Sequence, residues 1–189
     1  MKIAKSSLTR TVAPVLVVGV SLAAFAVPAT PAFAQGTPGS VVDRVGGTVR
    51  ILARADVANR MRVGLSGNGH LIVEDDTHIQ AGQGCTIMPG TDNTAADCGP
   101  ATGSGGVTGI NAALGNFGDS FFSTAPVNTN INAGTGGDFI RTGSGNDTIN
   151  LRDGVIGNDA AACDGGGNDA VVGNLRDVIT PDCERRVRF

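Results

Sequence analysis

The sequence predicts an all-β protein in which a small strand-rich antiparallel module precedes a short parallel β-roll, or β-solenoid, on the C-terminal side. Two patterns carry this prediction: a nine-residue repeat with Gly and Asp at fixed places, and, before it, short runs that alternate apolar and polar residues. Composition agrees, because the chain has 29 Gly, seven Phe and neither Trp nor Tyr. Such a chain needs many tight turns, or a fold that does not depend on bulky core side chains.

Residues 1–34 are predicted to be a secretory signal peptide, cleaved after Ala34. They run from the basic start MKIAKSSLTR through the apolar stretch VAPVLVVGVSLAAFAV to the small-residue end PAFA. These are the three parts of an export signal. A membrane anchor is the alternative, but Pro14 and Gly19 interrupt the apolar run and no basic flank follows it. We therefore expect a secreted protein, extracellular or associated with the cell surface, with no membrane span after cleavage.

The remaining 155 residues are acidic. Removing residues 1–34 takes away both Lys and one Arg, which leaves eleven Arg against seventeen acidic residues and a net charge of −6. Fifteen of the acids are Asp, which is common in turns and in calcium loops. This balance argues against nucleic acid or an anionic membrane as a partner, and it is compatible with a bound cation.

Residues 35–80 are expected to form the N-terminal strand module. Three segments of strand character, spaced ten to twelve residues apart, predict a small antiparallel meander: TVRIL (48–52), RMRVGL (60–65) and HLIVED (70–75). SGNG (66–69) carries the signal for a tight hairpin between the last two. Residues 81–112 are rich in Gly, Thr, Asn and Ala, and they are expected to be a linker that joins the two halves.

Four cysteines in an exported chain predict two disulfides, and these residues are Cys85, Cys98, Cys163 and Cys183. Three pairings are possible. We favour Cys85–Cys98 and Cys163–Cys183, because each closes a loop within its own segment, and the first would staple the linker. A zinc site is the competing interpretation, but the chain has no CxxC pair and its two histidines are far from the second cysteine pair.

The nine-residue repeat lies within residues 113–189. AGTGGDFIR (133–141) is followed by TGSGNDTIN (142–150), each with Gly at the second and fourth places, Asp at the sixth and Ile at the eighth. LGNFGD (114–119) and DGGGND (164–169) end in the same way. An inward apolar residue every nine positions is the register of a solenoid, and the predicted stack is Phe122, Ile131, Ile140 and Ile149.

Glycine and aspartate in these turns suit a hard cation. Glycine allows a positive φ, so several carbonyls can point at one spot, and Asp adds a short charged ligand. Calcium takes six to eight such oxygens and tolerates irregular geometry. The plain alternative is a metal-free solenoid, because Asn and Asp form left-handed turns without any ion. Recurrence of Asp where Asn would fit equally well favours Ca2+.

The pattern resembles GGxGxDxUx, the hemolysin-type (RTX) calcium-binding nonapeptide repeat, which forms a parallel β-roll. AGQGC (81–85) and DVITPDCE (177–184) are also similar to segments of exported actinobacterial calcium-binding proteins. The resemblance implies that Ca2+ sits between turns on the same side of the roll. The carboxylate ligands it implies are Asp119, Asp138, Asp147 and Asp169. The main-chain ligands it implies are Gly134, Gly136, Gly143, Gly145, Gly165 and Gly167.

The repeat is degenerate, so we expect only one to three calcium ions. Thr129 stands where Asp belongs, and Asp119 and Asp138 are 19 residues apart rather than 18. An insertion, RDGVIGNDAAAC (152–163), shifts the register of the residues after Asp147. The insertion could itself recruit ligands, of which the candidates are Asp153, Asp159 and Asp164. The basic ending RRVRF is expected to cap the last turn, since terminal repeats need a polar end.

No catalytic motif is present: the chain lacks GxSxG, HExxH and a P-loop. His70 and His78 flank a strand with acidic residues between them, but no third partner is placed by the sequence, so a surface pair is preferred over a hydrolase or metal site. We therefore expect a calcium-binding structural or surface-associated protein and not an enzyme. The alternative is a metal-free solenoid that acts as an adhesion or protein-interaction module.

Overall fold

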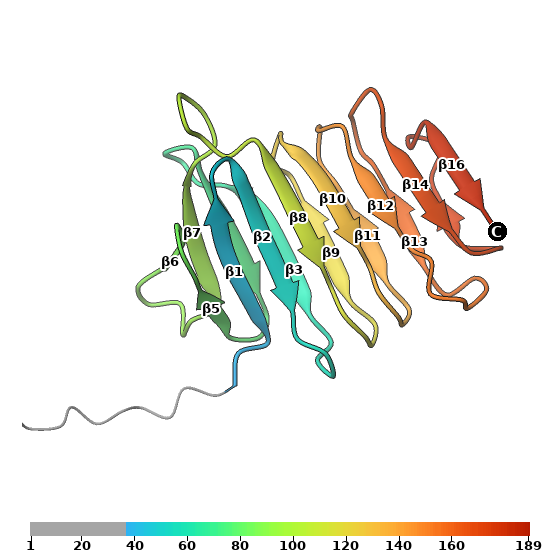
Figure 1. Cartoon of the computed structure of the whole chain (residues 1–189), viewed down its shortest axis with the longest axis horizontal. Coiled ribbons are helices and arrows are strands. Elements are labelled where there is room, and N and C mark those ends of the chain that lie inside the picture. Colours follow the sequence, from blue (N-terminus) through green and yellow to red (C-terminus); the bar gives the residue numbers. More distant parts are fainter. Residues whose placement is uncertain (1–36) are drawn as a thin grey trace, which may run out of the picture. The chain divides into compact units, whose positions relative to one another are not determined.

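The computed structural model describes residues 37–189, which form sixteen β-strands and no helix (Figure 1). The all-β prediction is confirmed for this part of the chain. The predicted signal peptide, residues 1–34, lies outside it. Among the described residues no helix is present that could cross a membrane.

The strands form two eight-stranded sheets. Sheet A contains, in order across the sheet, β16 (Arg185–Arg188), β14 (Ala170–Gly173), β12 (Thr148–Asn150), β10 (Asn128–Asn132), β8 (Gly109–Ala113), β2 (Thr48–Ala53), β1 (Ser40–Val45) and β5 (Ile79–Ala81). Sheet B contains β15 (Val178–Ile179), β13 (Ala160–Ala162), β11 (Phe139–Arg141), β9 (Ser120–Ser123), β3 (Arg60–Leu65), β4 (His70–Asp75), β7 (Ala95–Pro100) and β6 (Thr86–Ile87).

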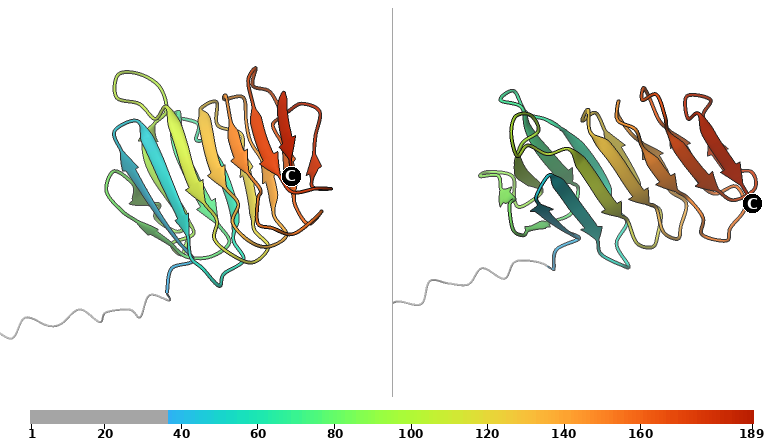
Figure 2. Two further views of the ribbon diagram at one scale, coloured as in Figure 1. Left: turned by 45° about the vertical axis from the view of Figure 1, so that its right-hand side comes forward. Right: turned by 45° about the horizontal axis from the view of Figure 1, so that its top comes forward.

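From β8 to β16 successive strands fall alternately in the two sheets, so each turn of the chain adds one strand to each. All neighbours in this part are parallel, for example β8 with β10 and β9 with β11. Figure 2 shows the loops that join the sheets following one another along the molecule. Turns on the same side are therefore stacked, and Asn116 forms an isolated β-bridge with Thr135 of the next turn.

The three predicted N-terminal strands are present as β2, β3 and β4, and the hairpin at 66–69 is closed by a hydrogen bond from Gly69 N to Ser66 O (2.8 Å). They do not form a separate module, however. β2 pairs with β8 and β3 pairs with β9, both in parallel, so the N-terminal strands continue the two sheets of the repeat.

Residues 81–112 also differ from the predicted linker, because they supply β6, β7 and most of β8. The strand β7 reads AADCGP and contains almost no large apolar residue. Its burial comes from small side chains, which leave no clear alternation in the sequence. All three predicted segments thus belong to one pair of sheets.

The core consists of inward side chains that stack from turn to turn. In sheet A, Ile131 lies opposite Ile149, which lies opposite Val171. In sheet B, Ile140 lies opposite Phe121, and the prediction of Phe122 as the inward residue is wrong: Phe121 is fully buried and Phe122 only partly. Ten residues separate Phe121 from Ile131, so the nine-residue register slips at this turn.

Both ends of the stack are closed by covalent and polar contacts. The disulfides Cys85–Cys98 and Cys163–Cys183 are present, as predicted. At the C-terminal end, the side chains of Arg186 and Arg188 donate to the carbonyl oxygens of Thr180 and Asp177, next to the last strand of sheet B. These arginines occupy the place where a further turn would stack.

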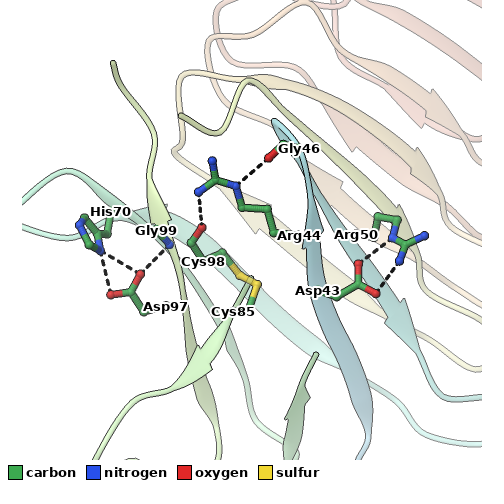
Figure 3. Close-up of a disulfide and its surroundings, with 9 residues drawn as sticks. All are labelled: Asp43, Arg44, Gly46, Arg50, His70, Cys85, Asp97, Cys98 and Gly99. Atoms are coloured by element: carbon green, nitrogen blue, oxygen red, sulfur yellow. Dashed lines mark hydrogen bonds and ion pairs between the residues drawn. A yellow bond between two sulfur atoms is a disulfide. The ribbon is translucent and has the colours of Figure 1, made fainter. Parts of the chain in front are cut away.

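At the N-terminal end, Arg44 of β1 links the two sheets. Its guanidinium donates from Nη1 to the carbonyl oxygen of Cys98 in β7 (2.9 Å) and from Nε to that of Gly46 (2.9 Å) (Figure 3). The first disulfide lies beside this contact (Figure 3). Arg44 thus ties sheet A to sheet B beside their edge strands, β5 and β6.

Candidate functional site

The candidate site consists of two columns of carboxylates, one along each sheet: five buried Asp residues, and the exposed Glu184 at the end of one column. In most turns an acidic residue lies two positions before the central buried residue of the strand, so its side chain also points inward. The sheet-B column contains Asp119, Asp138 and Asp159, and the sheet-A column contains Asp147, Asp169 and Glu184.

Each carboxylate in the sheet-B column accepts a hydrogen bond from the main chain of the preceding turn. Oδ1 of Asp119 accepts from the amide of Asn59 (2.7 Å), and Oδ1 of Asp138 accepts from the amide of Asp119 (2.8 Å). Oδ1 of Asp159 accepts from the amide of Asp138 (2.8 Å). Asp177 departs from the pattern, because its carboxylate accepts from Asn174 and Gly157 instead.

The sheet-A column repeats this arrangement. Oδ1 of Asp147 accepts from the amide of Thr129 (2.7 Å), and Oδ1 of Asp169 accepts from the amide of Asp147 (2.7 Å). Glu184 ends the column, with Oε2 accepting from the amide of Asp169 (2.7 Å). Thr129 therefore begins the column: its main-chain amide donates to Asp147, and it has no side-chain carboxylate that accepts from an earlier turn. This turn can for that reason lack an Asp.

The second oxygen of every Asp in the columns is buried without a hydrogen-bond partner. This set comprises Oδ2 of Asp119, Asp138, Asp147, Asp159 and Asp169. All five residues are at most 3% exposed. A buried carboxylate oxygen that receives no donor is costly, so a cation, a proton or an ordered water is expected at each of these groups.

Asp75 shows what a buried carboxylate looks like when its charge is satisfied. It is also 3% exposed, yet it accepts five hydrogen bonds, from Ser40 Oγ, Asn59 Nδ2, Arg60 N, and both N and Oγ1 of Thr77. The same chain thus surrounds one buried Asp with donors and leaves five others with a free oxygen. The contrast marks the columns as incomplete on their own.

Burial and mutual repulsion disfavour the charged form of the column residues. Burial raises the pKa of Asp119 to about 7, with a further rise from the charge of Asp138. Burial also raises the pKa of Asp159 to about 6, and the charge of Asp138 again adds to it. The pKa values of Asp138, Asp147 and Asp169 are raised by burial as well.

The turn glycines all allow close stacking, since a Cβ on Gly134 or Gly136 would also lie within 2 Å of a carbonyl oxygen of the preceding turn, but only this pair adds a left-handed backbone. Gly134 and Gly136 have positive φ values of 97° and 144°, as the sequence predicts for a turn that redirects its carbonyls. Gly143 and Gly145 do not adopt the left-handed backbone, but a Cβ on Gly145 would lie 2.3 Å from the carbonyl oxygen of Val127 in the turn it stacks on. Their role is close stacking of turns, a requirement that the repeat pattern alone does not reveal.

The structure brings the four predicted Asp ligands into the two columns, two to each. It also adds Asp159 and Glu184. In the sequence Asp159 is a candidate only through the insertion, because the residue two positions later is the small Ala161 rather than a large apolar one. Glu184 precedes Arg186 by two, and nothing in that basic ending signals a stacked position. By contrast, Asp164 lies on the surface in an ion pair with Arg141 (2.5 Å).

One feature of the columns suits calcium, and another restricts how calcium could be coordinated there. The partnerless Oδ2 atoms are hard anionic ligands of the kind Ca2+ prefers. Within residues 37–189, however, no three His, Cys, Asp or Glu side chains converge as a metal-binding group. A calcium site in the columns would therefore draw the rest of its oxygens from turn carbonyls.

The histidines lie away from the columns. His70 Nδ1 is 2.9 Å from Asp97 Oδ2, and Asp97 Oδ1 also accepts from the amide of Gly99 (2.7 Å) (Figure 3). His78 contributes its carbonyl oxygen to Gly39 and Ser40. Neither histidine belongs to a larger metal-binding group in the part of the chain that the structure describes.

No protein-family model matches this chain, and no curated protein or solved structure matches it either. The two columns are therefore the feature of this protein that bears most directly on its function.

Proposed function

We propose that this is an exported calcium-binding protein in which Ca2+ stabilises the stacked turns, with a structural or cell-surface role. The observation that carries the proposal is the set of five buried Asp residues whose Oδ2 atoms have no partner. A bound cation would neutralise their mutual repulsion and occupy the free oxygens. Outside the cell, where calcium is abundant, binding would add directly to the free energy of unfolding.

Both columns support the proposal, because each places carboxylates at consecutive turns on the same side of the sheets. Gly134 and Gly136, and likewise Gly143 and Gly145, precede the column residue of their turn by two to four positions in the sequence. The proposal requires that some of their carbonyls turn toward the free Oδ2 atoms when the ion binds. Two disulfides are consistent with an oxidising compartment.

Thermal unfolding of the disulfide-bonded protein in calcium, magnesium and chelator tests the proposal. We expect a midpoint rise that is specific to calcium. Asp138→Asn and Asp147→Asn should reduce it, because Asn can still accept the main-chain hydrogen bond but offers no second anionic oxygen. Asp76→Asn, which alters only a surface ion pair with Arg62, is the matched control. Equal midpoints in calcium and chelator would rule out the proposal.

A metal-free interaction module is the second candidate, and one surface favours it. The outer face of sheet A carries a group of exposed amides on the neighbouring strands β8, β10 and β12, consisting of Asn111, Asn128, Asn130, Asn132 and Asn150. Shallow depressions run across this face. Stability that does not respond to calcium, together with loss of partner binding on changing Asn130 to Ala, would support this candidate instead.

A further inference from the structure

The insertion forms the loop between β12 and β13, and this loop stacks on the turn that contains Gly136. The amide nitrogen Nδ2 of Asn158 donates to the carbonyl oxygen of Gly136 and to Oδ2 of Asp153 (2.8 Å). The main-chain amide of Gly136 also approaches Asp153 Oδ2 (3.5 Å). A single side-chain NH2 group therefore lies between two oxygen atoms from different turns.

Two partnerless oxygens accompany this contact. Asn158 Oδ1 is buried and receives no hydrogen bond, and the same is true of Oδ2 of Asp159, the next residue in the chain. Asp159 is 3% exposed. A half-turn of the Asn158 amide about χ2 would bring Oδ1 to the place of Nδ2, facing the oxygens of Asp153 and Gly136. Such a group of oxygens is unfavourable unless a cation lies among them.

The charge of Asp153 is stabilised by neutral donors: Oδ1 accepts from the amide of Val155 (2.7 Å) and Oδ2 from Asn158 Nδ2 (2.8 Å). None of the ion pairs in residues 37–189 involves Asp138, Asp153 or Asp159. The insertion thus adds a carboxylate beside the sheet-B column where the column is already repulsive.

We propose that the insertion builds a calcium site of its own, outside the nonapeptide pattern. Asp153 and Asn158 are its side-chain ligands and Gly136 O is its main-chain ligand, while Asp159, the next residue after Asn158, adds a buried oxygen without a partner. In the metal-free protein the Asn158 NH2 group takes the place of the cation. This inference rests on the proposed calcium-binding function and assigns one of the sites to residues that the repeat does not predict.

Asn158→Asp gives the sharpest test. In chelator the new carboxylate would repel Asp153 and the Gly136 carbonyl, so the unfolding midpoint should fall below that of the wild type. In calcium it would act as a charged ligand, and the affinity of this site should rise by about tenfold, since ligand charge tunes calcium affinity. A side chain with a purely structural role would lose stability in both conditions and gain no affinity.

The Asp153→Asn variant tests whether the insertion binds a calcium ion, because the number of bound ions can be counted. Calcium binding by equilibrium dialysis should show one ion fewer per molecule than the wild type, while Asp164→Asn, which changes an exposed acid directly after the insertion, should leave the number unchanged. Far-UV circular dichroism in chelator confirms that each variant is folded, and amide chemical shifts of Gly136 and Asn158 should no longer respond to calcium in Asp153→Asn.

The outcomes separate this inference from the proposed function. If the wild type binds calcium and Asp153→Asn binds the same number of ions with the same affinity, the insertion site is wrong and the column sites stand. If the wild type binds no calcium, the proposed function is wrong and this inference falls with it.

Discussion

At the scale of single residues, burial alone does not decide what an Asp does here. Asp75 and Asp138 are equally buried, but the first accepts five hydrogen bonds and the second one. The first is surrounded by neutral donors. The second has a free oxygen and a raised pKa. The same substitution should therefore have opposite effects at the two positions.

We predict that Asp75→Asn lowers the free energy of unfolding by about 2 kcal/mol, because an amide NH2 would face donors that need an acceptor. In chelator, Asp138→Asn should leave the stability unchanged or raise it, since it removes repulsion from the column. Urea unfolding followed by circular dichroism measures both, because the chain contains no Trp or Tyr for fluorescence. A loss of similar size at both positions would contradict the distinction.

The raised pKa values predict how stability depends on pH without metal. An Asp in the unfolded chain has a pKa of about 3.9. In the folded protein, burial raises the pKa of Asp119 to about 7 and that of Asp159 to about 6. The folded state thus holds protons that the unfolded state releases. In chelator the stability should be greatest near pH 4 and should fall as the pH rises through 7.

In calcium the dependence should reverse over the same range, because protons compete with the ion for the column carboxylates. Melting curves between pH 4.5 and pH 8, in chelator and in calcium, check both signs. Curves that fall together with rising pH in the two conditions would indicate that no ion enters the columns.

At the scale of strands and turns, the distance between stacked turns decides whether a glycine can be replaced by a larger residue. A Cβ at Gly145 would lie 2.3 Å from the carbonyl oxygen of Val127, whereas a Cβ at Gly167 would meet no atom within 4 Å. Neither residue adopts a positive φ. The two positions therefore differ in steric room and not in backbone strain.

Gly145→Ala is expected to lower the free energy of unfolding by about 1–3 kcal/mol, the usual range for overpacking. Gly167→Ala should change it by less than about 0.5 kcal/mol. Thermal unfolding of the two variants gives the comparison. Equal destabilisation would show that turn stacking does not depend on the missing side chain at Gly145.

Much of the arrangement of strands and turns could be predicted from the sequence, because Gly recurs where turns must stack and Asp recurs where acids must point inward. The prediction is wrong at Phe122, where a single extra residue between Phe121 and Ile131 exchanges the inward and outward phenylalanines. A side-chain period of two makes any one-residue slip an exchange of faces. Strands made of Ala and Gly, such as β7 and β13, have no apolar alternation to detect.

At the scale of the whole molecule, contacts are made mainly between neighbouring turns, so the two ends are closed by different devices. Cys163–Cys183 closes the C-terminal end across a sequence separation of 20 residues, and Arg186 and Arg188 lie over it. Arg44 and Cys85–Cys98 close the N-terminal end. In such a chain each end can open without unfolding the other.

Replacing Cys163 and Cys183 together with Ser is expected to lower the free energy of unfolding by about 3 kcal/mol. Hydrogen exchange should show faster opening in β14, β15 and β16, while β2, β3 and β4 keep their protection. Uniform acceleration along the whole chain would mean that the two ends are more strongly coupled than their contacts indicate.

The hydrogen bonds of the columns all run in one direction: each carboxylate binds the main-chain amide of the turn before it. A newly formed turn thus displays an amide that stays unbonded until the next segment of chain arrives. For a polypeptide that emerges from a channel with its N-terminus leading, every turn is secured by its successor. Glu184 and Cys183, late in the sequence, then secure the amide of Asp169 and form the second disulfide.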